Sequence, residues 1–245
     1  MRESRRDIVW VAALWGVITL LAEMWVAGAE MVPLGLSREA EIVDDAFDLL
    51  LVLAVPVVTF VLVVLGYSVA RFRTTTDETG QPVRTNSRFV GAWVAISSGL
   101  AVLVIITPGF TGLDELRGEP DSDLTIEVTA EQWNWTFRYV EADVTVEDAD
   151  ELVLPVGERV RFLVTSTDVI HSLWIPGFRI KIDAVPGRVT EVLTTPTETG
   201  RFREDPNLRV QCAELCGTGH ARMDAAVHVV DAGEFGAWLD GLTGG

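Results

Sequence analysis

Lysine is almost absent from this chain of 245 residues, and basic residues as a whole are scarce. Lys181 is the only lysine, and 36 acidic against 19 basic residues give a formal net charge of -17. Such a surface repels the phosphates of nucleic acid, which excludes a nucleic-acid-binding function. An acidic, lysine-poor surface resembles the proteins of extreme halophiles, and it suits the docking of a basic partner. Internal repeats and low-complexity tracts are also absent from the sequence.

Long apolar runs divide the first half of the chain into candidate membrane spans. Residues 8–29 are apolar except for Glu23, and Ala46 to Ala70 and Phe89 to Pro108 follow as further runs. A bilayer core of about 30 Å needs about 20 helical residues, so each run is long enough to cross it. The first run also fits a cleaved signal peptide with a small-residue site at residues 27–29. Cleavage and retention of this segment both stay open.

The charges beside these runs orient the chain. Arginines gather at the N-terminus and in the loop at residues 71–88, whereas residues 30–45 and 114–123 are acidic. The positive-inside rule therefore places the loop in the cytoplasm and everything after residue 110 outside. We expect a multi-pass protein of the cell membrane, in contact with membrane lipid. Its predicted regions are a signal peptide or extra transmembrane helix plus outer loop (1–45), a transmembrane helical hairpin (46–112) and an extracytoplasmic domain (113–245).

Beyond residue 121 the sequence is typical of an all-β domain. Leu124 to Thr129 alternates as a half-buried strand does, and turn residues separate further short runs. These runs are Glu151–Pro155, Arg159–Thr165, Val189–Thr194, Arg209–Cys212 and Ala225–Val230. Short, regularly spaced strands predict a β-sandwich or barrel. We also expect a short amphipathic helix at residues 233–242 whose Phe235, Trp238 and Leu239 face this domain.

Both cysteines of the chain lie in one stretch, Gln211 to Met223. Cys212, Cys216 and His220 are evenly spaced there, with Glu214 between the cysteines. Thiolate, imidazole and thioether are ligands that soft or borderline metals select, copper above all. The stretch therefore predicts a metal-binding loop.

Two structural alternatives apply to the same residues. The cysteines would fit a disulfide or buried apolar thiols, and the cluster would fit structural zinc. Zinc rarely uses methionine, which favours copper. A loop site also needs a ligand from a second strand, and His171 is the candidate. His228, in an alternating strand, is expected to be structural or exposed.

These residues resemble subunit II of haem–copper cytochrome c oxidases. The family's copper loop, Cys-x-Glu-x-Cys-Gly-x-x-His-x-x-Met, is matched by residues 212–223. Its other motifs are matched by Asp168 to Pro176, by Lys181 to Gly187 and by the aromatic run Gln132 to Trp135. The resemblance covers residues 46–231.

The resemblance implies a membrane-anchored cupredoxin-like Greek-key β-barrel with two transmembrane helices, or three with the first segment. It also implies a binuclear CuA centre of two copper ions. The bridging thiolates would be Cys212 and Cys216, the imidazole ligands His171 and His220, and the weak axial ligands Met223 and the Glu214 backbone carbonyl. The Glu214 carboxylate would reach a Mg or Mn ion at the interface with the catalytic subunit. Asp183 would lie in the same region, or simply cap a turn.

A function and partners follow from the resemblance. The centre would accept electrons near Trp133 from a cytochrome c or a small blue copper protein, with Trp135 as a packing residue. It would pass them to the haem of oxidase subunit I, which reduces O2 to water with proton pumping; subunit III is a further expected partner. The oxygen chemistry belongs to another chain because three histidines are too few for haem and copper together.

One position departs from the family, and four other functions compete. Val90 stands where the family often has a Glu that begins a proton path, so either the proton entry of this enzyme differs or the chain belongs to a divergent branch. A membrane-anchored copper carrier acting outside an oxidase would use one cysteine. A quinol oxidase subunit would lack the ligands, and a nitrous-oxide reductase needs a further large domain. A structural zinc site would have no redox role.

Overall fold

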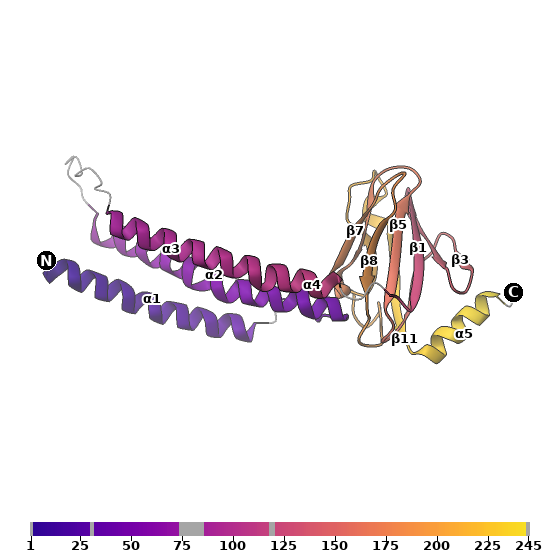
Figure 1. Cartoon of the computed structure of the whole chain (residues 1–245), viewed down its shortest axis with the longest axis horizontal. Coiled ribbons are helices and arrows are strands. Elements are labelled where there is room, and N and C mark those ends of the chain that lie inside the picture. The colour runs from indigo at the N-terminus through magenta and orange to yellow at the C-terminus, as the bar shows by residue number, and fades with distance from the viewer. Residues whose placement is uncertain (1, 30–31, 74–85, 118–120, 244–245) are drawn as a thin grey trace. The chain divides into compact units, whose positions relative to one another are not determined.

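A computed structural model describes residues 2–29, 32–73, 86–117 and 121–243. Most of the predicted cytoplasmic loop at 71–88, including Arg84, lies outside these residues. The chain forms two units (Figure 1). One comprises Met1–Met31 and Asp45–Asp114, and the other comprises Val32–Asp44 and Glu115–Gly245.

The helical unit contains three helices that are long and apolar enough to cross a membrane. They begin with α1 (Arg2–Gly28) and α2 (Arg38–Arg71). The third span comprises α3 (Ser87–Val104), a π-helical turn η1 (Ile105–Phe110) and α4 (Thr111–Arg117). Thr107 inside η1 has non-helical backbone angles because the residue before a proline is disfavoured in the α region. The predicted spans are confirmed.

The second helix starts eight residues before the predicted run at Ala46. The Ser37 hydroxyl accepts a hydrogen bond from the Ala40 amide at 3.0 Å, which caps the first turn. Glu39 and Glu41 in that turn place negative charge at the positive end of the helix dipole. Hydropathy alone does not detect these polar signals, so the apolar run gave too late a start.

The β unit consists of two sheets whose facing sides enclose the core. One sheet has the order β3-β2-β1-β5-β8, and the other has the order β4-β11-β10-β6-β7 with β9 beside β11. The first sheet contains β1 (Leu124–Glu131), β2 (Asn134–Tyr139), β3 (Val144–Val146), β5 (Val160–Ser166) and β8 (Thr190–Thr194). The second contains β4 (Glu151–Pro155), β6 (His171–Ile175), β7 (Ile180–Ala184), β9 (Gly200–Arg201), β10 (Arg209–Cys212) and β11 (Asp224–Val230).

The six predicted strands are present, and β2, β3, β6, β7 and β9 are additional. The core includes Phe137, Phe162, Leu152 and Leu173, all fully buried. The predicted C-terminal helix is α5 (Ala232–Thr243), with Phe235 buried and Trp238 against Tyr139 at 5.1 Å between ring centroids. Single-turn helices η2 (Pro176–Phe178) and η3 (His220–Arg222) complete the unit.

Residues 32–44, predicted only as an acidic outer loop, pack on the β unit. The Leu36 amide donates to the Gly177 carbonyl at 2.8 Å, and the Arg38 amide donates to Thr195 at 3.0 Å. The Glu39 carboxylate accepts from the Thr195 amide at 2.8 Å, and Asp44 forms an ion pair with Arg179 at 2.8 Å. This segment, residues 32–44, is called the anchor segment below.

Candidate metal centre

The predicted metal loop joins two neighbouring antiparallel strands. Cys212 is the last residue of β10, and β11 begins at Asp224, directly after Met223. The Cys212 amide donates to the Met223 carbonyl at 3.0 Å, so the two ends of the loop are held together. The loop is therefore short, closed at its base and fixed to the sheet.

His171 reaches the loop through strand pairing. It is the first residue of β6, and β6 pairs with β10 so that Leu173 lies opposite Cys212. His171 shares its sheet face with Leu173, because alternate residues point the same way. Its Nδ1 lies 3.8 Å from Cys212 Sγ. The distant ligand predicted from the sequence is thus brought to the loop.

The remaining predicted ligands converge on the two sulfur atoms. The Sγ atoms of Cys212 and Cys216 are 3.7 Å apart, and both thiols are free, so the disulfide alternative does not hold here. His220 Nδ1 lies 3.6 Å and Met223 Sδ 3.9 Å from Cys216 Sγ. The Glu214 carbonyl oxygen lies 3.2 Å from Cys212 Sγ. Each sulfur atom thus has one imidazole nitrogen beside it.

The centre is closed to solvent on most sides. Cys212 and Cys216 are 1% and 4% exposed, and His171 and Met223 are buried. His220 is half-buried, and the Glu214 side chain is exposed. Burial first, and then the neighbouring Cys212 thiol, raise the pKa of Cys216 to about 11. Without a metal, the Cys216 thiol therefore stays protonated at neutral pH.

Asp168 orients His171, a role that the sequence motif did not reveal. Its Oδ1 lies 2.9 Å from His171 Nε2. Burial would raise the pKa of Asp168, but hydrogen bonds from His171 and from the amides of Val169 and Gln132 outweigh it and lower the pKa to about 2. A carboxylate beside Nε2 favours the tautomer protonated there, which leaves the Nδ1 lone pair directed toward Cys212.

Trp133 covers the metal loop from outside. Its Nε1 donates to the Cys216 carbonyl at 3.2 Å, and Gln132 Nε2 donates to the same oxygen at 2.7 Å. The ring lies so close to Gly219 that a methyl group on Gly219 would overlap it. Trp133 is 40% exposed, whereas Trp135 is buried, with its ring centroid 6.4 Å from that of His171. Exposed Trp133 and packed Trp135 agree with the sequence-based expectation.

The other residues singled out in the sequence lie elsewhere. His228 on β11 lies 3.3 Å from Glu151, outside the cluster. Asp183 is exposed on β7, opposite Ser172 of β6, and Val90 lies exposed in α3. Gln132, Asp168 and Gly219 are the site residues that sequence reasoning missed as functional groups. The sequence pointed to these three residues only in that they lie inside the motifs that match the family.

The donor set fits a soft or borderline metal. His171, Cys212 and Cys216 bring their ligand atoms within 4.8 Å of one another, all buried. Sulfur and imidazole nitrogen are the donors that copper and zinc prefer, and these sulfur and nitrogen atoms face one another across the cluster. The residues present therefore fit a metal centre.

Comparisons with known proteins place this geometry in a family. A family model described as the periplasmic domain of cytochrome c oxidase subunit II matches residues 141–230. A probable cytochrome c oxidase subunit 2 of Rickettsia bellii is 33% identical over 212 residues, covering 78% of this chain and 76% of the relative. This chain belongs to the cytochrome c oxidase subunit II family. The resemblance predicted from the sequence is confirmed.

Two further relatives complete the comparison. A probable cytochrome c oxidase subunit 2 of Rickettsia prowazekii is 33% identical over 78% of this chain, which spans 65% of that relative's length. A crystal structure of the periplasmic domain of cytochrome oxidase subunit II from Bradyrhizobium japonicum is 34% identical. It covers 51% of this chain and 96% of its own, with a TM-score of 0.47.

Family membership settles the coarse biology of this subunit II chain. Members are subunits of cytochrome c oxidases, which are oxidoreductases assembled with other oxidase subunits. Three apolar helices and a periplasmic-type domain confirm a membrane protein whose cupredoxin-like C-terminal domain is extracytoplasmic.

Proposed function

We propose that this subunit holds a binuclear CuA centre and carries electrons from an external donor to the haem of subunit I. The observation that supports it is the pair of free thiols at 3.7 Å with one imidazole nitrogen beside each sulfur. Such a set offers two equivalent metal positions that share both sulfur atoms. When bound, the two coppers take up and release one electron with little change in geometry.

The protein's part is to hold the ligands still. Cys212 and Cys216 would hold the copper ions through their thiolates, and His171 and His220 through their Nδ1 atoms. Met223 and the Glu214 carbonyl would be weak ligands that tune the reduction potential, as the buried surroundings would also do. Strand pairing fixes Cys212, and Asp168 fixes the His171 ring, so few groups need to move when the electron arrives.

Trp133 is the proposed point where electrons arrive. It is partly exposed, and its indole donates to the carbonyl of Cys216, the residue that carries one of the two sulfur atoms. Leu215, Val169 and Ile170 are also exposed. The apolar side chains offer a donor contact area that salt does not screen, in contrast to the acidic surface. Both a cytochrome c and a small blue copper protein fit this description.

The exposed Glu214 carboxylate is proposed as a ligand for Mg or Mn. Its backbone carbonyl contacts Cys212 Sγ, and its side chain is exposed. One residue would then connect the copper centre with the interface to subunit I, where the oxygen chemistry and proton pumping take place. Subunit III is a further proposed partner.

Metal content and electron paramagnetic resonance test the proposal. The full chain is the right material, because the anchor segment belongs to the β unit although it leads into α2, the second span. Two coppers per chain with hyperfine structure shared over both nuclei are expected. One copper with a single-nucleus pattern would indicate a mononuclear carrier, and a preference for zinc would remove the electron-transfer function.

Copper loading is expected to weaken as pH falls from 8.5 to 7. Free cysteine has a pKa near 8.5 and Cys216 one of about 11, so binding must displace thiol protons throughout this window. Each displaced proton costs about tenfold in apparent affinity per pH unit, so two thiols give up to about 100-fold per pH unit. Competition with a chelator of known pH dependence measures the slope. The Met223→Leu variant should show the same slope of copper affinity against pH, because a thioether carries no proton. A flat profile would mean that thiolates are not the ligands.

A further inference from the structure

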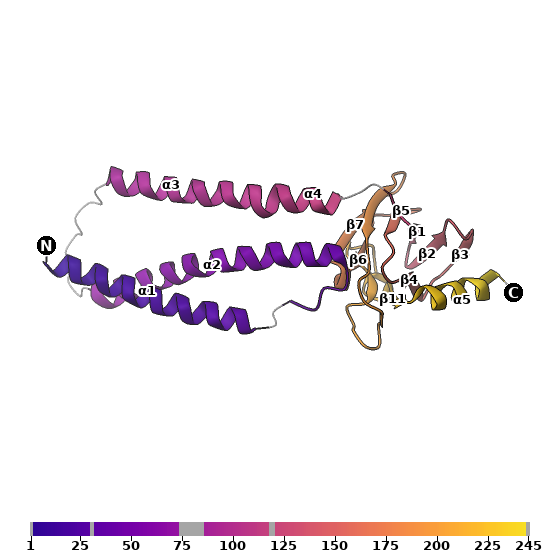
Figure 2. The ribbon, with the colours of Figure 1, turned by 60° about the horizontal axis from the view of Figure 1, so that its bottom comes forward.

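Specific contacts join α1 and α2 from their cytoplasmic ends to the middle of both helices. The Tyr67 hydroxyl donates to Asp7 Oδ1 at 2.7 Å, and the Trp15 indole donates to the Pro56 carbonyl at 2.9 Å. One turn further, the hydroxyls of Thr19 and Thr59 lie 2.7 Å apart. Figure 2 shows the two helices running alongside each other. These contacts keep the N-terminal ends of α1 and the C-terminal end of α2 in register.

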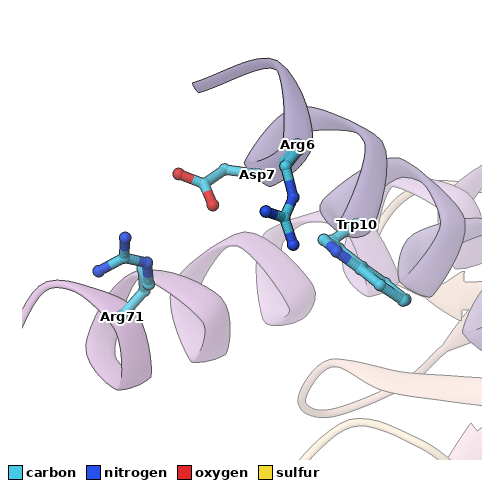
Figure 3. A pocket seen from close by; sticks show the side chains of 4 residues that line it. All are labelled: Arg6, Asp7, Trp10 and Arg71. Carbon is cyan, nitrogen blue, oxygen red and sulfur yellow. The ribbon is translucent and has the colours of Figure 1, made fainter. Parts of the chain in front are cut away.

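A charged pocket of about 250 Å³ lies at these ends, lined by Arg6, Asp7, Trp10 and Arg71 (Figure 3). Arg6 and Trp10 extend from α1 toward α2, and Arg71 rises from the last residue of α2. Two guanidinium groups face one carboxylate, and Asp7 is already a hydrogen-bond acceptor for Tyr67. In the described part of the chain, Arg6 and Arg71 form no salt bridge. The pocket therefore has an excess of positive charge.

An apolar groove of about 390 Å³ continues from the same place into the membrane span. It shares Asp7 with the charged pocket and is lined mainly by apolar side chains of both helices, among them Val11, Trp15, Phe60 and Val64. Arg71 ends the α2 span and Arg5 begins the α1 span, so the charged pocket lies at the membrane surface and the groove below it. The charged pocket and the apolar groove therefore meet at the membrane surface.

We propose that this site binds an anionic glycerophospholipid of the cytoplasmic leaflet. Its phosphodiester lies between Arg6 and Arg71, because a guanidinium group donates paired hydrogen bonds to phosphate oxygens. One acyl chain occupies the groove, and Trp10 packs at the level of the headgroup, where amphipathic rings prefer to lie. A zwitterionic headgroup also carries a cation. Two arginines would repel that cation and only one carboxylate would attract it, so an anionic headgroup is favoured.

A second apolar hollow shows what distinguishes this site. It measures about 460 Å³ between α2 and α3, with Leu50, Leu100 and Ile105 among its lining residues, and no charged residue lines it. Such a hollow takes any lipid tail without regard to the headgroup. Of these two apolar hollows, the one between α1 and α2 lies beside cations, so lipid selectivity is expected there.

Native mass spectrometry of the full chain in detergent tests the proposal. The intact mass must first equal about 26.8 kDa, because loss of α1 would remove the site and overturn the proposal. Dioleoylphosphatidylglycerol should then bind in preference to dioleoylphosphatidylcholine. A guanidinium group that donates hydrogen bonds to a phosphate contributes about tenfold or more to binding, so R6Q/R71Q should weaken phosphatidylglycerol binding about 100-fold.

The matched control is R5Q/R73Q, which removes the same charge at the same membrane surface from residues that do not line the pocket. It should change the affinity by less than about fivefold, because neither arginine contacts the bound phosphate and a neutral detergent micelle presents no anionic surface. Equal losses in the two double variants, or equal binding of the two lipids, would refute a specific site. Circular dichroism and copper content check that each variant is folded. If the chain binds no copper, circular dichroism still reports folding, and the lipid affinities can still be compared.

The acyl chain is tested separately from the phosphate. Val64→Trp fills the groove and should abolish phosphatidylglycerol selectivity, whereas Val58→Trp, on an exposed position of α2 outside the groove, should not. Inorganic phosphate should fail to displace the lipid. Displacement by inorganic phosphate, together with normal binding by Val64→Trp, would show a bare phosphate site and overturn the proposal.

Discussion

Serine in place of Cys216 is expected to abolish the hyperfine pattern shared by two copper nuclei. The Cys216 sulfur contacts Cys212 Sγ, His220 Nδ1 and Met223 Sδ, so it is the common neighbour of three other ligands. A serine oxygen is smaller than sulfur and is a hard ligand, so it does not replace a bridging thiolate. Copper content should fall from two ions per chain to one or none, as measured by elemental analysis and electron paramagnetic resonance.

Met223→Leu is the matched control for this experiment. It conserves volume in a buried position and removes only the weak ligand. Two coppers and the shared pattern should remain, with a changed reduction potential. If the Cys216→Ser chain is folded by circular dichroism and still binds two coppers in a shared pattern, the bridging role of Cys216 is wrong.

Alanine in place of Gly219 is expected to slow oxidation of the donor by about 100-fold. A methyl group at this position would overlap the Trp133 ring, so the ring must leave the surface of the metal loop. A displacement of about 1 Å at a reacting group can cost about 100-fold in rate. Stopped-flow kinetics with a reduced donor measures the effect, and the copper spectrum shows whether the ligands themselves have moved.

A double-mutant cycle separates the ring from the loop. Trp133→Ala should slow electron transfer while leaving the copper spectrum intact, and Gly219→Ala added to it should cost little more, because no ring remains to be displaced. Gly236→Ala, which has open space around the added methyl group, should leave the rate unchanged. A normal rate in Gly219→Ala, or additive losses in the double variant, would contradict the role proposed for Trp133.

Much of this arrangement could be predicted from the sequence, for physical reasons that differ between regions. The spans follow from the length of the apolar runs, and the strands at residues 124–131 and 224–230 follow from their alternation. The convergence of Cys212, Cys216, His220 and Met223 follows from their spacing in one closed loop. In each case the prediction rests on residues that lie close together in the sequence.

What could not be predicted depends on contacts between distant residues. The hydrogen bond that His171 donates to Asp168 requires the turn before β6, and the packing of Trp133 on Gly219 requires two loops to meet. Strand β6 was hidden because it is buried on both faces and does not alternate. The start of α2 depended on a serine cap and on acidic groups, which hydropathy does not detect.

The anchor segment has a consequence for how the protein is made. A ribosome synthesises its binding partners, around Gly177 and Thr195, more than a hundred residues after the segment itself. At about 5–20 residues per second, the exported segment would wait roughly ten seconds or more before β unit residues reach it. During that interval the Leu36 and Arg38 amides can be satisfied only by water or by a helper protein. Biogenesis of this subunit therefore includes a late closing step, in which an early-translocated peptide is captured by a domain that folds after both later spans are in the membrane.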